Sequence, residues 1–225
     1  MTIALPVAVS GRLVGSAVLV ARSNEHLFFA TCLHLFGEGT DIRIAVPPHG
    51  GNCTAAQPYP LTTTPALAAS VVATDPFSDL AIVHVPDSTA STPPMPNIVS
   101  AAGLVPVGTE VVVLGYPFAP IGSFLETWTP AFVTAIAKRH FNPSLSVDEL
   151  VLSATAHPGS SGSAVVGKKD GILYGIVRGA LAPPEALRIG DIPIATDTSV
   201  TFASSAHILH DLLLTAKTAV GATDA

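Results

Sequence analysis

Short apolar runs separated by turn residues make up the first 86 residues of the chain. The runs have the length of strands and end at glycine, proline or short polar stretches, which is typical of antiparallel strands. Residues 2–9 and 13–21 are expected to form a hairpin around Ser10-Gly11-Arg12, and residues 47–66 a long loop. The strands expected in this part are 2–9, 13–21, 27–31, 41–46, 67–73 and 80–85. Six short antiparallel strands predict a small barrel.

A second series of strands follows a segment rich in proline, serine and threonine, a composition typical of linkers. The expected strands are 109–115, 131–138, 149–154, 163–167, 172–177 and about 195–203, with a hairpin turn at Asp170-Gly171. The spacing then becomes helical, and Ser204 or Ser205 is expected to cap a helix. Its apolar face would consist of Ile208, Leu209, Leu212, Leu213 and Ala216.

This pattern divides the chain into four parts. We expect an N-terminal barrel over 1–86, a linker over 87–100, a C-terminal barrel over 101–203 and a helix over 204–217. No apolar run reaches the roughly 18 residues that a membrane span needs. The sequence shows no internal repeat.

Composition excludes some classes of partner. The net charge is −6, only 12% of residues are charged, and no basic run occurs, which argues against a nucleic-acid partner. His207 and His210 are spaced i, i+3, but no cysteine or carboxylate cluster completes a zinc set. We therefore expect no metal ion and no cofactor.

Candidate chemistry lies in the turn Gly159-Ser160-Ser161-Gly162-Ser163. A tight glycine-flanked turn can expose a serine hydroxyl and direct successive N–H groups into one small cavity. The alternative is a plain glycine- and serine-rich hairpin loop. A nucleophilic serine also needs a base and a carboxylate, and His34 and Asp79 each lie at the end of an expected strand.

The chain order histidine, aspartate, serine is one of the orders known for a serine triad. Here the sequence resembles the trypsin-like (chymotrypsin-fold) serine peptidases, and among them the bacterial Deg/HtrA-type peptidase domain. The matching segments follow the family's order: Gly15-Ser16-Ala17, Ala30-Thr31-Cys32-Leu33-His34, Asp75-x-x-x-Asp79-Leu80-Ala81, Val107-Gly108-x-x-Val111-x-x-Leu114-Gly115-Tyr116-Pro117, Pro158-Gly159-x-Ser161-Gly162 and Tyr174-Gly175-Ile176. The resemblance implies an all-β fold of two perpendicular six-stranded antiparallel β-barrels with a C-terminal helix. We find no PDZ-like second domain.

The resemblance also implies roles for the candidate residues. Ser161 would be the nucleophile, His34 the general base and Asp79 the residue that orients the imidazole, while the backbone N–H groups of Gly159 and Ser161 would form the oxyanion hole. Ser160 and Ser163 compete with Ser161, and Asp75, which precedes a proline, competes with Asp79. These roles predict a serine endopeptidase that forms an acyl-enzyme on a protein or peptide substrate. The alternative is a catalytically silent or partner-activated peptide-binding module.

Secreted trypsins have a carboxylate just before the catalytic serine, which pairs with a new N-terminus on activation. Ser160 occupies that place, so this mode of activation is not implied. The oxyanion loop must then be ordered in another way, by substrate or by an activating partner protein.

Substrate preference is expected to depend on five residues. By the resemblance, Thr155 lies at the base of the primary pocket, Ala156 beside it, and Ile176 and Val177 on its wall. These side chains predict a small or medium apolar residue before the scissile bond, and not lysine or arginine. Arg178 leaves a preference for an acidic residue as the alternative. His157 either lines the cleft or is a turn residue.

The expected compartment is the cytoplasm. Residues 13–21 are apolar and follow Arg12, but cleavage after Ala21 would leave 12 residues before His34, too few for the two preceding strands. Cys32 and Cys53 are the only cysteines, and their positions suggest reduced thiols rather than a disulfide.

Overall fold

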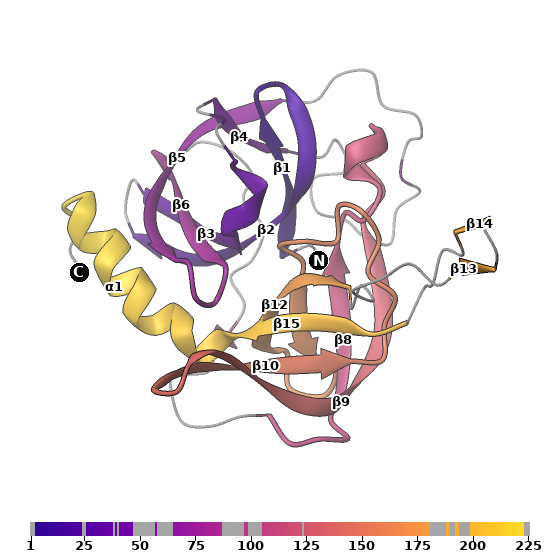
Figure 1. Cartoon of the computed structure of the whole chain (residues 1–225). Coiled ribbons are helices and arrows are strands. Elements are labelled where there is room, and N and C mark those ends of the chain that lie inside the picture. Colours follow the sequence, from indigo (N-terminus) through magenta and orange to yellow (C-terminus); the bar gives the residue numbers. More distant parts are fainter. Residues whose placement is uncertain are drawn as a thin grey trace.

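Two β-barrels lie side by side, and a C-terminal helix packs along the first of them (Figure 1). In this computed structural model the described residues are 3–23, 26–37, 39, 41–46, 57, 65–86, 97–98, 105–122, 124–180, 188–189, 192–193 and 199–222. The linker expected over 87–100, apart from 97–98, most of the loop expected over 47–66, and Cys53 lie outside the described residues.

The first barrel is closed and antiparallel. Its strands are β1 (Ala4–Val9), β2 (Arg12–Ser23), β3 (His26–Cys32), β4 (Ile42–Ala45), β5 (Ala66–Asp75) and β6 (Leu80–Pro86). They pair in the order β1-β2-β3-β6-β5-β4, and β4 closes the ring on β1. All six expected strands are present, each with slightly shifted ends.

The second barrel also contains six antiparallel strands. They are β8 (Glu110–Gly115), β9 (Thr127–Asn142), β10 (Leu145–Leu152), β11 (Ala164–Gly167), β12 (Ile172–Ala180) and β15 (Thr201–Ser205). They pair in the order β11-β8-β9-β10-β15-β12, and a β11–β12 pairing completes the ring. The short β7 (Asn97–Ile98) adds a parallel edge to β12. The all-β fold with two barrels is therefore confirmed.

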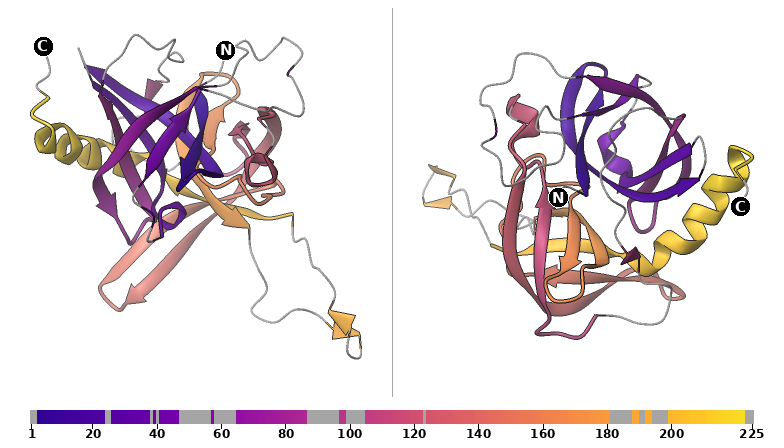
Figure 2. Two further views of the ribbon diagram at one scale, coloured as in Figure 1. Left: turned by 90° about the horizontal axis from the view of Figure 1, so that it is seen from above. Right: turned by 180° about the vertical axis from the view of Figure 1, so that it is seen from behind.

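Some features of the second half differ from the expectation. Strand β9 is much longer than the expected strand 131–138, and its hairpin with β10 extends beyond the barrel (Figure 2). Strand β9 is continuous because its first half pairs with β8 and its second half with β10. The last strand begins at Thr201 rather than near 195. A separate pair, β13 (Arg188–Ile189) and β14 (Ile192–Pro193), lies away from both barrels (Figure 2).

The helix starts later than predicted. A 3₁₀ turn, η3 (Ala206–Ile208), precedes α1 (Leu209–Ala219), and no side chain caps either of them. Ser204 and Ser205 instead belong to β15, where they pair with β10 and β12. Ser205 is the N-cap residue of η3, but its Oγ lies 2.8 Å from His207 Nδ1, and the hydroxyl of Ser204 donates to the Ser78 carbonyl. The prediction of a side-chain cap was wrong because both hydroxyls bond to other partners.

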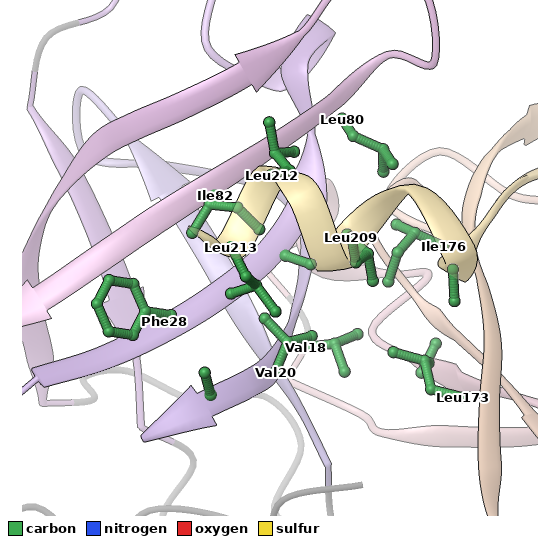
Figure 3. Close-up of a cluster of buried hydrophobic side chains, with 14 of the residues drawn as sticks. Val18, Val20, Phe28, Leu80, Ile82, Leu173, Ile176, Leu209, Leu212 and Leu213 are labelled. Atoms are coloured by element: carbon green, nitrogen blue, oxygen red, sulfur yellow. The ribbon is translucent and has the colours of Figure 1, made fainter. Parts of the chain in front are cut away.

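A shared apolar layer joins the helix and both barrels. Strands β2, β3 and β6 each send alternate side chains into the first barrel and outward, for example Phe29 inward and Phe28 outward. The outward residues meet β11, β12 and the buried face of α1 (Figure 3). The helical residues in this layer are Leu209, Leu212, Leu213 and Ala216. Both faces of these strands are therefore buried, which explains their nearly continuous apolar sequence.

In the described part of the chain, no helix is long and apolar enough to cross a membrane.

Candidate active site

The turn that carries Ser161 connects β10 to β11 and is shaped by two glycines. Ser160 N–H donates to the His157 carbonyl at 2.9 Å, and Gly159, at the third position of this turn, has φ +101°. Proline followed by a left-handed glycine is the sequence that a type II turn requires. Gly162 has φ +84°, and a Cβ there would lie 1.7 Å from the Ser16 carbonyl oxygen. No residue but glycine fits at Gly162 without displacing backbone.

His34 lies just after β3, in the 3₁₀ turn η1 (Leu33–Leu35), at the junction of the two barrels. Its Nδ1 is 2.6 Å from Asp79 Oδ2, and its Nε2 is 3.1 Å from Ser161 Oγ. Because Nδ1 faces a carboxylate, the favoured neutral tautomer has the proton on Nδ1 and leaves Nε2 as an acceptor. An unbroken series of polar contacts thus joins Asp79, His34 and Ser161.

Asp79 lies in the turn between β5 and β6 with φ +55°, a left-handed conformation that is uncommon for residues other than glycine. Its Oδ1 accepts the His34 backbone N–H at 2.9 Å, so both carboxylate oxygens face His34. Its competitor Asp75 instead accepts the Phe77 N–H at 3.0 Å, which is a local Asx turn.

Two contacts from the second barrel hold the Asp79 turn. Arg139 donates to the Phe77 carbonyl, and Ser204 donates to the Ser78 carbonyl at 2.5 Å. The position of Asp79 therefore depends on residues far away in the sequence.

The Ser161 hydroxyl has two acceptors within reach. Besides His34 Nε2, the Arg178 carbonyl oxygen lies 3.0 Å from Ser161 Oγ. A hydroxyl has a single proton, so it donates to one of these acceptors at a time.

The side chain of Ser160 holds the loop around Ser161 by a hydrogen bond within the loop. Ser160 is 6% exposed, and its Oγ accepts the His157 N–H at 2.9 Å, while Ser160 N–H donates to the His157 carbonyl. These contacts come from the loop itself, and ordering by substrate or an activating partner stays a prediction. Among the described residues, the N–H groups of Gly159 and Ser161 donate to no protein acceptor.

A cavity of about 360 Å³ lies at one end of the second barrel, next to the turn that carries Ser161. Ser160 and Ser163 line it, whereas Ser161 itself does not. The cavity is lined by small, hydroxyl-bearing and aromatic residues. They are Val113, Gly115, Pro117, Phe118, Thr127, Thr129, Ser153, Ala154, Thr155, Ala156, His157, Ser160, Ser163, Val177 and Thr201. Thr155, Ala156 and Val177 line the cavity. His157 lines it too, and its ring stacks on Phe118 with the ring centroids 5.8 Å apart.

Two residues expected on the pocket wall do not line the cavity. Ile176 is fully buried in the apolar layer near α1 (Figure 3), because alternate side chains of β12 face opposite sides. Arg178 Nε lies 3.0 Å from Glu149 Oε1, and Glu149 is 3% exposed. Arg139 pairs with the same carboxylate at 3.1 Å. A buried carboxylate needs such partners, so Glu149 holds the side chain of Arg178 away from the cavity.

Several residues that line the cavity had not been identified from the sequence. Thr127 and Thr129 lie on the first half of β9, which the apolar pattern did not reveal. Phe118 comes from the loop after β8, and Thr201 from β15. No local signal identified them, because the cavity is formed where five separate segments of the chain meet.

Cys32 lies close to His34 and Asp79. Its Sγ and the ligand atoms of His34 and Asp79 all lie within 4.8 Å of one another. Burial, and next the charge of Asp79, raise the pKa of Cys32 well above its ordinary value. Its thiol donates to the Val177 carbonyl at 3.0 Å.

Comparison with known proteins points to one family. The family model described as the trypsin-like peptidase domain matches residues 15–176. No curated protein sequence matches the chain.

Solved structures are similar in fold. The inactive form of Rv3671c from M. tuberculosis H37Rv, a serine-to-alanine mutant, has a TM-score of 0.62 at 21% identity. That alignment covers 99% of this chain and 88% of the other. The HtrA-type protease AlgW with a decapeptide has a TM-score of 0.63 at 20% identity, covering 93% of this chain and 52% of AlgW. With a tripeptide, AlgW has a TM-score of 0.63 at 18% identity, covering 94% and 59%.

Proposed function

Because the chain belongs to the family of trypsin-like peptidase domains, we propose that it is a serine endopeptidase that hydrolyses peptide bonds through an acyl-enzyme on Ser161. The observation that supports this most directly is the series of contacts from Asp79 to His34 to Ser161, at 2.6 and 3.1 Å. These distances are within hydrogen-bond reach for a nucleophile, its base and the group that orients the base.

The residues of the site divide the steps of the proposed reaction among them. Ser161 Oγ attacks the substrate carbonyl carbon while His34 Nε2 takes its proton, and Asp79 stabilises the resulting imidazolium. The N–H groups of Gly159 and Ser161 donate to the developing oxyanion. His34 then gives its proton to the leaving amine as the C–N bond breaks. Water, activated by His34, hydrolyses the ester and releases Ser161.

The cavity beside Ser161 is proposed to take the side chain before the scissile bond. Among the described residues that line it there is no carboxylate that could pair with lysine or arginine. Arg178 pairs with Glu149 rather than entering the cavity, which removes the basis for a preference for acidic side chains through Arg178. We therefore propose a small or medium uncharged side chain at this position.

Labelling with a fluorophosphonate tests the mechanism. The wild-type protein should be labelled on Ser161, and Ser161→Ala should abolish both labelling and cleavage of dye-labelled casein while the melting temperature stays nearly unchanged. Labelling that follows Ser160 or Ser163 instead would assign the nucleophile to a neighbour. A wild-type protein that binds peptide but is never labelled would support the alternative, a silent peptide-binding module.

We also propose that the protein works in a reducing compartment such as the cytosol. Cys32 is a free, buried thiol. Thiol titration of the denatured protein, isolated with its thiols protected from oxidation, should find Cys32 and Cys53 both reduced. A linked pair in a tryptic digest would contradict this proposal.

A further inference from the structure

Ser16 is a fully buried polar residue on β2, at the junction of the two barrels. It belongs to the first barrel, yet its contacts reach the loop that carries Ser161. We propose that Ser16 is a positioning residue that holds this loop in the shape needed for oxyanion stabilisation. The proposal rests on the proposed peptidase function.

The hydroxyl of Ser16 uses all of its hydrogen-bonding capacity. Ser16 Oγ donates to the Gly159 carbonyl at 3.4 Å and accepts the Tyr116 N–H at 2.9 Å. Ser163 Oγ lies 3.3 Å away and donates to the same oxygen. A hydroxyl has one proton and two lone pairs, so these three contacts saturate it.

The backbone of Ser16 holds a second point of the loop. Ser16 N–H donates to the Ser161 carbonyl at 2.9 Å, and the Ser16 carbonyl accepts Thr31 Oγ1 at 2.6 Å. The carbonyl between these points, that of Ser160, accepts the Ser163 N–H at 3.0 Å. The carbonyls of Gly159, Ser160 and Ser161 are therefore all hydrogen-bonded, the first and the last of them to Ser16. The N–H groups of Gly159 and Ser161 have no acceptor among the described residues.

Of the groups of Ser16, the hydroxyl is the one that bonds to Gly159. Among the described residues it is the only donor to the Gly159 carbonyl, although the contact is long. Glycine has the widest range of backbone conformations, so Gly159 depends on outside contacts to stay in one of them. Tyr116 and Pro117 present carbonyl oxygens 2.9 and 2.8 Å from the position that a Cβ of Gly159 would occupy. By binding both Tyr116 N–H and the Gly159 carbonyl, Ser16 links these two packed segments.

The test compares Ser16→Ala with Ser205→Ala, which removes a hydroxyl at a buried position (3% exposed) on β15 outside the site. Ser16→Ala keeps both backbone contacts of Ser16. We expect the rate constants for fluorophosphonate labelling and for acylation by p-nitrophenyl acetate to fall about tenfold or more. The dissociation constant of the ester should stay within about twofold. A lost oxyanion donor costs about 10²- to 10³-fold, and a misplaced one should cost less.

Two further measurements separate positioning from loss of stability. The inhibition constant of benzeneboronic acid, whose adduct with serine carries a negative tetrahedral centre, should rise by the same factor as the acylation rate falls. The pH profile of labelling, which reports His34, should not shift. If Ser16→Ala does not fold, Ser16→Cys keeps a similar volume with a weaker donor and serves for the same measurements.

The possible results are distinct. Wild-type labelling on Ser161, together with unchanged rates and unchanged boronate affinity in Ser16→Ala, would overturn the positioning role. An effect equal to that of Ser205→Ala, or confined to ester binding, would also overturn it. Absence of wild-type labelling, or labelling that persists in Ser161→Ala, would instead reject the proposed function.

Discussion

The interiors of the two barrels differ in what fills them. Among the described residues, the interior of the first barrel holds a large cluster of apolar side chains, including the fully buried Phe29 and Ile44. The core of the second barrel includes the small residues Ala131, Ala154 and Ala203, and at one end it gives way to a cavity bordered by hydroxyl groups. Ala154 and Val177 belong to both the core and the cavity wall.

In the proposed reaction, the first barrel supports His34 and Asp79, and the second provides the cavity that takes a substrate side chain. The first barrel carries His34 and Asp79 in turns at the ends of strands, where a filled interior fixes the strands below them. In the second barrel, the end next to the Ser161 turn holds the cavity rather than further core side chains. Contacts across the junction, from Ser16, Arg139 and Ser204, then bring the two sets of residues together.

The largest expected effect tests whether the two barrels form one catalytic unit. His34→Ala in the first barrel and Ser161→Ala in the second should each lower the turnover of casein by at least about 10³-fold. Residues that act as a unit are not additive, so the double variant should be no slower than the slower single variant. If the losses multiplied in the double variant, the two residues would act independently.

The second prediction concerns the filled interior. Phe29→Ala should lower the free energy of unfolding by about 3–5 kcal/mol, because it opens a void in a packed core. Thr129→Ala, at the exposed edge of the cavity, should change it by less than about 0.5 kcal/mol. Urea denaturation of both variants measures the difference. Similar losses at the two positions would contradict the contrast between the barrels.

The third prediction concerns the cavity. An apolar side chain gains about 0.8 kcal/mol per buried methylene, whereas an unpaired lysine or arginine is desolvated at a cost of several kcal/mol. Peptides with valine, alanine or leucine before the cut should therefore be cleaved at least about tenfold better than those with lysine or arginine, a difference of roughly 1.4 kcal/mol. A peptide-library cleavage profile measures this preference.

The variant Arg178→Ala tests whether Arg178 contributes to the cleavage preference set by the cavity. Because Arg178 pairs with Glu149, the substitution should leave the preference unchanged while lowering stability. A preference for glutamate that this substitution erases would mean that Arg178 reaches the substrate after all.

The smallest effect concerns a pair of histidines on the first barrel, of which His84 is buried and His26 half-buried. His84 lies 2.9 Å from His26, Nε2 to Nδ1. Burial, and next the proximity of His26, hold the pKa of His84 below its ordinary value of 6.5. As the pH falls through about 6.5, the unfolded chain takes up a proton that the folded barrel does not, so stability falls with the pH.

The variant His84→Gln isolates this contribution. Between about pH 7 and pH 5, its free energy of unfolding should fall less steeply than that of the wild type. His140→Gln, the same substitution at an exposed position, serves as the control. An unchanged slope in His84→Gln would show that this histidine does not contribute to acid sensitivity.

Local sequence determined the elements from which the site is built. The apolar runs of β2, β3 and β6 have the length of strands, and the glycines of the turn at Ser161 are dictated by positive φ at Gly159 and Gly162. These signals depend on neighbours within a few residues, so they could be read along the chain. The same holds for the buried face of α1, whose spacing is helical.

Tertiary structure decided which residues meet. His34 and Ser161 are 127 positions apart, and the orientation of Asp79 depends on contacts from Arg139 and Ser204. The sequence could not show that Glu149 would bind Arg178. Nor could it show that the Ser205 hydroxyl would bond to His207 rather than to a helix N–H. Nor could it show that Ser16 would bond to Gly159. The physical reason is that a polar group at a barrel junction bonds to whatever partner the packing brings near, and strand register sets that partner across long sequence separations.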